Sequence, residues 1–243
     1  MKKLMIVAIA VLVSTSIQAQ NTREAIQNTK QILTGKKMLE RDVKELADFS
    51  AKVTTFTRFY NARKTAEANR LKASLVKDMV REVRQSEAKA KKARREVNQS
   101  TREVISERKE ISDNKKDSRR TTYDRRDDKR DMARDRANLR DDKRDRRDDV
   151  RDLKQQIVRA ERQAKILKGL QSYNFAFGEN DLLKARIYKK MITDFEETMK
   201  ADVAATRIEL QEDRREAKED RRERRDDRNE RNEKDANRKR WRN

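Results

Sequence analysis

The chain has no proline, cysteine or histidine and only three glycines among its 243 residues. Proline and glycine are the residues that most often end or bend a helix, so this chain has few points at which it can turn. Charged residues make up 46% of the sequence and aromatic residues 5%, which leaves little material for a globular core. We therefore predict an all-α fold of elongated antiparallel helical hairpins, or a coiled coil, with highly charged helical arms.

The first nineteen residues have the layout of a cleavable secretory signal. Two lysines precede an apolar run from Leu4 to Val13, and a small polar stretch follows and ends at Ala19. The apolar run is about half of the ~20 residues that a helix needs to span a bilayer, although a membrane anchor remains the alternative. We expect cleavage near Ala19 and a periplasmic or secreted product. Because cysteine is absent, stability must come from helix packing.

A block rich in arginine and aspartate lies in the middle of the chain. The run Asp-Asp-Lys-Arg-Asp occurs at 127–131 and again at 141–145, a separation of two heptads. On a helix, opposite charges three or four residues apart can pair, and each pair contributes about 0.2–0.5 kcal/mol. The repeat predicts a charged helix. The alternative is a disordered linker, because aspartate is a poor helix former and apolar residues are nearly absent.

Apolar residues recur at helical spacing in four stretches, which predicts two hairpins. Alignment of the second hairpin about its loop places Phe195 opposite Ile157 and Val158. The predicted order is a signal peptide at 1–19, a first helical hairpin at 20–118 that turns near Asn61, an Arg/Asp-rich charged helix at 119–152, a second helical hairpin with a charged arm at 153–236 that turns through the loop 173–181, and a basic C-terminal tail at 237–243.

Two basic clusters are candidate sites for an anionic polymer or a membrane surface. The tail cluster combines four cations with the only tryptophan, which suits an anionic lipid headgroup layer. A solvated helix face and a frayed tail are the alternative interpretations. The first cluster is Lys89, Lys91, Lys92, Arg94 and Arg95, and the second is Arg238, Lys239, Arg240, Trp241 and Arg242.

An apolar stripe continues beyond the length that the first predicted helix can cover. Val97, Val104 and Ile111 lie seven residues apart and so return to one face of a helix. This predicts a helix–helix interface, either with the second hairpin or with a second copy of the chain. We accordingly expect a homo-oligomer or a helical protein partner.

Two phenylalanines, Phe175 and Phe177, lie in the loop predicted at 173–181. They either bind a partner at the tip of the hairpin or cap its core.

Residue types that usually carry catalysis are missing. Without histidine and cysteine, the chain lacks the common general base, the usual metal ligand and the strongest neutral-pH nucleophile. Its carboxylates lie among arginines, and no Gly-rich phosphate loop or metal-ligand spacing occurs. We expect no enzymatic activity, no cofactor and no metal.

These features together favour a secreted, non-enzymatic coiled-coil scaffold or spacer of the cell envelope that binds anionic envelope polymers or a membrane surface. The signal peptide, the pI of ≈ 10.2 and the helical arms are also similar to the Skp-like holdase chaperones of the periplasm, which implies binding of unfolded outer-membrane proteins. The second alternative is an extracellular nucleic-acid binder, which the high pI favours.

Overall fold

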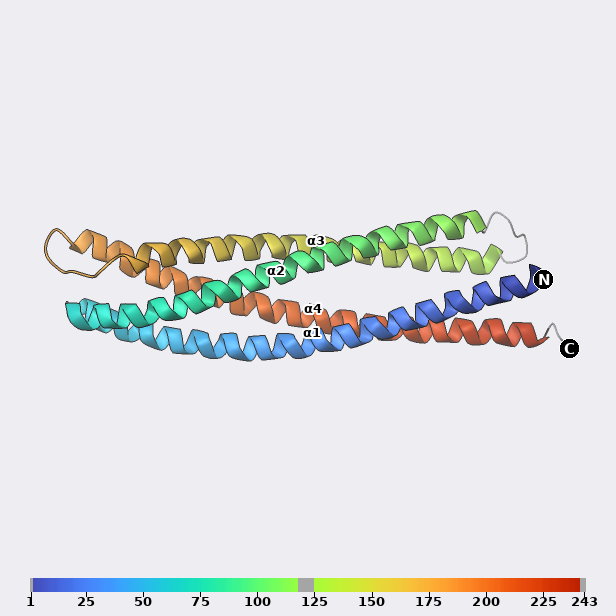
Figure 1. Cartoon of the computed structure of the whole chain (residues 1–243), viewed down its shortest axis with the longest axis horizontal. Helices are drawn as coiled ribbons and strands as arrows, with labels where there is room; N and C mark the ends of the chain where they lie inside the picture. Colours follow the sequence, from blue (N-terminus) through green and yellow to red (C-terminus); the bar gives the residue numbers. More distant parts are fainter. Residues whose placement is uncertain (1, 118–124, 241–243) are drawn as a thin grey trace. The chain divides into compact units, whose positions relative to one another are not determined.

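The computed structural model describes the backbone of residues 2–117 and 125–240, and side chains at 29–109, 111, 112, 115, 132–219, 221, 222 and 225. The described residues form four long α-helices and no strand. The predicted all-α fold of antiparallel helical hairpins is therefore confirmed. The helices are α1 (Lys2–Asn61), α2 (Thr65–Asp117), α3 (Arg125–Gln171) and α4 (Leu182–Arg240) (Figure 1).

The chain divides into two compact units. One unit comprises the described parts of residues 1–47 and 200–243, which belong to α1 and α4. The other unit comprises residues 48–199 and holds the end of α1, all of α2 and α3, and the start of α4.

A tight turn joins α1 to α2 at the position that the sequence predicts, just after Asn61. The amide of Lys64 donates to the carbonyl of Phe59 at 3.0 Å, and the amide of Arg63 donates to that of Tyr60 at 3.1 Å. These two bonds form a Schellman motif, which satisfies carbonyls left free at a helix end. The motif needs a left-handed residue, and Arg63 fills that position with a φ of 52°.

Within the unit of residues 48–199, α2 and α3 lie side by side and run in opposite directions (Figure 1). Arg146 Nε of α3 donates to Thr101 Oγ1 of α2 at 3.0 Å. Further along the pair, Gln156 Nε2 of α3 donates to the Ser86 carbonyl at 3.5 Å. Residue numbers fall on α3 as they rise on α2, so the two helices form an antiparallel hairpin about the segment between them.

The end of α1 and the start of α4 also pack together in this unit. The ring centroids of Phe49 and Phe195 are 5.6 Å apart, and both side chains are buried. One residue further along each helix, Ser50 Oγ donates to Glu196 Oε1 at 2.8 Å.

The partner of Phe195 differs from the predicted one. Alignment of two helices placed Phe195 against Ile157 and Val158, but the structure places it against Phe49. Val158 is 63% exposed and Ile157 is 38% exposed.

The predicted antiparallel pairing of α3 with α4 is present, since Arg162 lies 3.6 Å from Asp194 and Tyr173 stacks on Tyr188. Its register differs from the predicted one by about one turn, and Phe195 packs on α1, which an alignment of two helices did not consider.

Aromatic side chains from α1 and from the loop between α3 and α4 fill one end of the unit. The ring of Phe175 lies 4.9 Å from Phe56, and the ring of Phe177 lies 5.3 Å from Tyr60. Asn69 of α2 fixes the loop, because its amide accepts from the Phe175 backbone N–H at 2.7 Å and donates to the Phe175 carbonyl at 2.9 Å. Phe175 is buried, and of the two interpretations of these phenylalanines the structure shows the core cap.

The unit of residues 1–47 and 200–243 contains a close approach between α1 and α4. A Cβ placed on Gly35 would lie 3.2 Å from Leu210 Cδ1 and 3.8 Å from Asp213 Oδ2. Glycine at this position therefore lets the two helices come together, despite its cost of about 1 kcal/mol within a helix. The side chains buried in this unit include Asp42, Asp202, Val203, Thr206 and Leu210.

The Arg/Asp-rich block is helical from Arg125 onward, as its heptad repeat predicts. Arg144 lies 3.2 Å from Asp141, and Arg151 lies 3.1 Å from Asp148, so both pairs use the i, i+3 spacing. Such pairs partly offset the low helix propensity of aspartate.

Candidate polyanion-binding surface

The helix α2 has one buried side and one exposed side within the unit of residues 48–199. Its buried side chains recur at helical spacing and include Leu75, Met79, Val83, Ser86, Ser100 and Val104. Because α2 is amphipathic, its opposite side forms a continuous exposed face over the described side chains from Thr65 to Lys109, a length of about 66 Å at 1.5 Å per residue.

A straight row of cations follows this exposed face, and we call it the α2 basic stripe. Successive members are seven residues apart, except for one step of four. A heptad row drifts by about 20° per repeat on a straight helix, and the step of four turns it back. The spacing is about 10.5 Å for each heptad step. The stripe consists of Arg70, Lys77, Arg84, Lys91, Arg95, Arg102 and Lys109, all of them exposed.

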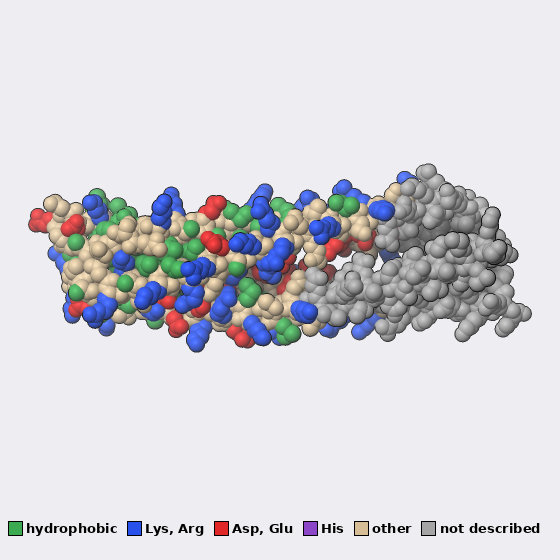
Figure 2. Space-filling model, viewed as in Figure 1, with side chains coloured by type: hydrophobic (Ala, Val, Ile, Leu, Met, Phe, Trp, Pro, Cys, Tyr) green, Lys and Arg blue, Asp and Glu red, His purple; other side chains and the backbone are tan. Residues whose placement is uncertain are grey.

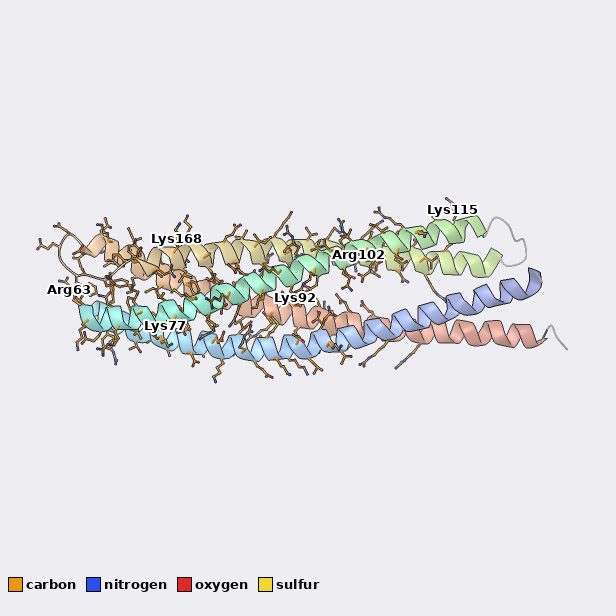
Figure 3. All side chains as sticks on the ribbon, in the orientation of Figure 1. Arg63, Lys77, Lys92, Arg102, Lys115 and Lys168 are labelled. Carbon is orange, nitrogen blue, oxygen red and sulfur yellow. The ribbon has the colours of Figure 1, made fainter. Side chains whose placement is uncertain are left out.

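The cations of the stripe are not neutralised by carboxylates of the described residues. No ion pair involves any of the seven within this part of the chain. Two carboxylates of α2 bind other partners, since Asp78 binds Lys52 at 2.5 Å and Arg81 at 3.2 Å, and Glu96 binds Lys92 at 2.7 Å. Figure 3 labels two members of the stripe, Lys77 and Arg102, at separate points along α2.

The visible face of the described residues carries more Lys and Arg side chains, drawn in blue, than Asp and Glu side chains, drawn in red (Figure 2). This distribution agrees with the formal net charge of +21. A surface of this sign attracts polyanions.

The predicted cluster at 89–95 does not form one patch. Lys89 and Lys92 are half-buried, and Lys92 is bound to Glu96. Lys91, Arg94 and Arg95 are exposed, and two of them belong to the α2 basic stripe. Residues that are adjacent in sequence point to different sides of a helix, so a run of cations in the sequence does not form one cationic patch on the surface.

The predicted tail cluster lies outside the described side chains. The backbone of α4 is described as far as Arg240 and so includes Arg238 and Lys239, but the side chains of these three residues are not described. Trp241 and Arg242 lie beyond the described residues. The role expected of the tail remains a prediction.

Sequence reasoning missed the stripe as a unit, although its signal is present in the sequence. Lys or Arg recurs every seventh residue from Arg70 to Lys91 and again from Arg95 to Lys109. A search for cations at heptad spacing, rather than for runs of cations, would have found it.

The apolar residues predicted to form an interface lie along α2 where α3 runs beside it. Val104 is 5% exposed, and Val97 and Ile111 are half-buried. The Arg146–Thr101 hydrogen bond lies between the levels of Val97 and Val104. The structure places α3 of the same chain at this position, in the part that the sequence predicts as the Arg/Asp-rich charged helix and not as the second hairpin.

Acidic side chains come together between α2 and α3. Burial, followed by the charges of Glu103 and Asp141, raises the pKa of Asp142 from 3.8 to about 6. Burial also raises the pKa of Asp149, with Glu96 among the contributing charges. Asp142 Oδ2 is buried without a hydrogen-bond partner. The packing of these helices therefore favours protonated carboxyl groups here.

Within the described residues, no group of three or more His, Cys, Asp or Glu side chains is arranged to hold a metal ion. The described helical segments also contain no stretch that is long and apolar enough to cross a membrane. Comparison of the chain with protein-family models, with curated proteins and with solved structures gives no match.

Proposed function

We propose that this protein is a secreted, non-enzymatic helical scaffold or spacer of the cell envelope that holds anionic polymers or surfaces through its exposed basic faces. The signal peptide at 1–19 would direct the protein out of the cytoplasm, and the long helical hairpin would act as the spacer.

The observation that carries the proposal is the α2 basic stripe, a regular exposed row of cations that form no ion pair among the described residues. On α3, by contrast, some arginines pair with aspartates one turn away, as in Arg144 with Asp141 and Arg151 with Asp148. The cations of the α2 basic stripe have no such partner among the described residues. Unneutralised cations on a regular exposed face repel one another, and an anionic ligand relieves that repulsion.

Retention of the whole protein on immobilised anionic supports, compared with a neutral dextran support, tests the proposal. We expect retention on an acidic polysaccharide, on duplex DNA or on anionic lipid vesicles, with release as salt is raised. Equal behaviour on the neutral and the anionic supports would contradict the function. Cleavage of the signal is read separately, by mass spectrometry of the exported protein.

The holdase alternative rests on a pair of exposed apolar side chains one turn apart at the start of α4. Leu183 is 68% exposed and Ile187 is 52% exposed. A holdase binds unfolded chains through such surfaces. If the protein keeps an unfolded outer-membrane protein soluble, and a Leu183→Ser/Ile187→Ser variant does not, this alternative replaces the scaffold.

A further inference from the structure

We infer that the α2 basic stripe is the binding surface for a linear acidic polysaccharide that lies along α2. This inference rests on the proposed function and names both its site and its ligand class. The polysaccharide is one that carries single carboxylates separated by neutral sugar groups.

The spacing of the cations carries the choice of ligand. Heptad steps put one cation at about every 10.5 Å, and the whole stripe extends about 58 Å from Arg70 to Lys109. Duplex DNA has one phosphate per about 1.7 Å of its axis when both strands are counted, so each 10.5 Å step would match one cation to roughly six phosphates. A polysaccharide with one carboxylate per disaccharide has a far sparser charge, and single cations in a straight row can neutralise it one by one.

The residues beside the stripe fit a sugar chain better than a lipid surface. Asn98 and Ser106 are exposed, lie on the same side of α2 by helical spacing, and can hydrogen-bond sugar hydroxyls. Among the described side chains of α2, Ile105 is the one large apolar group that is exposed, at 60%. A helix that binds in a membrane interface needs a full apolar face, which this side of α2 lacks.

The exposed carboxylate Glu87 lies between two members of the stripe and gives a second test of the binding role. Glu87 lies three residues after Arg84 and four before Lys91, so it shares their side of the helix. A negative charge at this position opposes the binding of a polyanion. Its removal should therefore strengthen binding if the ligand lies along the stripe.

The experiment measures the affinity of the whole protein for hyaluronan, which has one carboxylate per disaccharide, over a range of salt concentrations. The stripe variant combines Arg70→Gln, Lys77→Gln, Arg84→Gln and Lys91→Gln. The control variant combines Arg136→Gln, Arg140→Gln, Lys154→Gln and Lys165→Gln, which removes two arginines and two lysines from exposed positions of α3. Both variants lose the same charge, and circular dichroism checks that both keep their helices.

We expect the stripe variant to lose on the order of tenfold or more in affinity at low salt and to show a weaker salt dependence. At ~0.15 M salt, where the Debye length is about 8 Å, the control variant should lose no more than about twofold, because the attraction between its distant cations and the ligand is then screened. Glu87→Gln should bind more tightly than the unaltered protein.

Equal losses in the two four-residue variants, or no effect of Glu87→Gln, would overturn the stripe as the site while the proposed function stands. Tighter stripe-dependent binding of duplex DNA or of anionic vesicles than of hyaluronan would overturn the ligand class. If the protein bound none of the anionic probes, the proposed function itself would be contradicted.

Discussion

Arg63 adopts a left-handed backbone conformation, which residues other than glycine usually avoid. Its φ of 52° closes the Schellman motif at the end of α1. A left-handed residue with a side chain costs about 1–2 kcal/mol, because its Cβ approaches the following carbonyl oxygen. The chain turns here without a glycine because two backbone hydrogen bonds offset that cost.

Arg63→Gly should raise the free energy of unfolding by about 0.5–1 kcal/mol, because glycine removes the steric cost but loses more backbone entropy on folding. Chemical denaturation, monitored by circular dichroism, measures this change in the free energy of unfolding. Ala62→Gly is the control and should be destabilising, since Ala62 has no positive φ. A loss of stability in Arg63→Gly would show that the side chain, not the backbone, holds the turn.

Asp142 should make stability depend on pH. Burial raises its folded-state pKa from 3.8 to about 6, so the folded protein holds this proton more tightly than the unfolded chain does. The stabilisation by the protonated form is complete below pH ~3.8 and is lost as pH rises through about 6. An asparagine side chain at this position mimics the protonated carboxyl group at every pH, so Asp142→Asn should melt higher than the unaltered protein at pH ~7.5 and equally at pH ~4.

Thermal melting of both proteins at several pH values checks this prediction. A difference in melting temperature that stays constant with pH would contradict it.

Packing of α2 against α3 decides which apolar residues of α2 contribute to stability. Val104 and Ile105 are neighbours in sequence, but Val104 is 5% exposed and Ile105 is 60% exposed. Hydrophobic stabilisation scales with the area removed from water, so the two residues should respond very differently to the same substitution.

Val104→Ser should lower the free energy of unfolding by about 2 kcal/mol, because it removes buried methyl groups and buries a hydroxyl. Ile105→Ser should change it by no more than about 0.5 kcal/mol. Urea denaturation of the two variants measures both values. If they lose equal stability, the side of α2 that packs on α3 has been assigned incorrectly.

On the scale of the whole molecule, one aromatic cluster joins segments that are far apart in the chain. Phe56 of α1 contacts Tyr60 and the loop residue Phe175, while Tyr173 stacks on Tyr188 of α4 with ring centroids 3.7 Å apart. The cluster concentrates a large share of the few aromatic residues at one end of the unit of residues 48–199. The fold of that unit should therefore depend on it strongly.

Phe56→Ala should lower the free energy of unfolding by about 3–5 kcal/mol, since Phe56 is fully buried and its loss leaves a cavity. Phe59→Ala is the matched control in the same helix, where the ring is only half-buried, and should cost about 1 kcal/mol. Circular dichroism during denaturation gives both values. A small effect of Phe56→Ala would show that the cluster is not central to the unit.

The sequence by itself determined the class of the fold, the turn after Asn61, the loop near 173–181 and the helical state of the Arg/Asp-rich block. These features follow from local causes: missing helix breakers, apolar spacing and charge pairs within one helix. Such causes act between residues a few positions apart, so they can be read along the chain.

Only the tertiary structure decided which helix faces pack and which stay exposed. It packed Phe195 on Phe49, placed α3 beside Val104, and left the seven cations of the α2 basic stripe exposed and without an ion pair among the described residues. Each long helix offers several apolar positions, and heptads on different helices can pair in many registers of similar energy. The choice among them depends on the summed packing of four helices, which no single stretch of sequence contains.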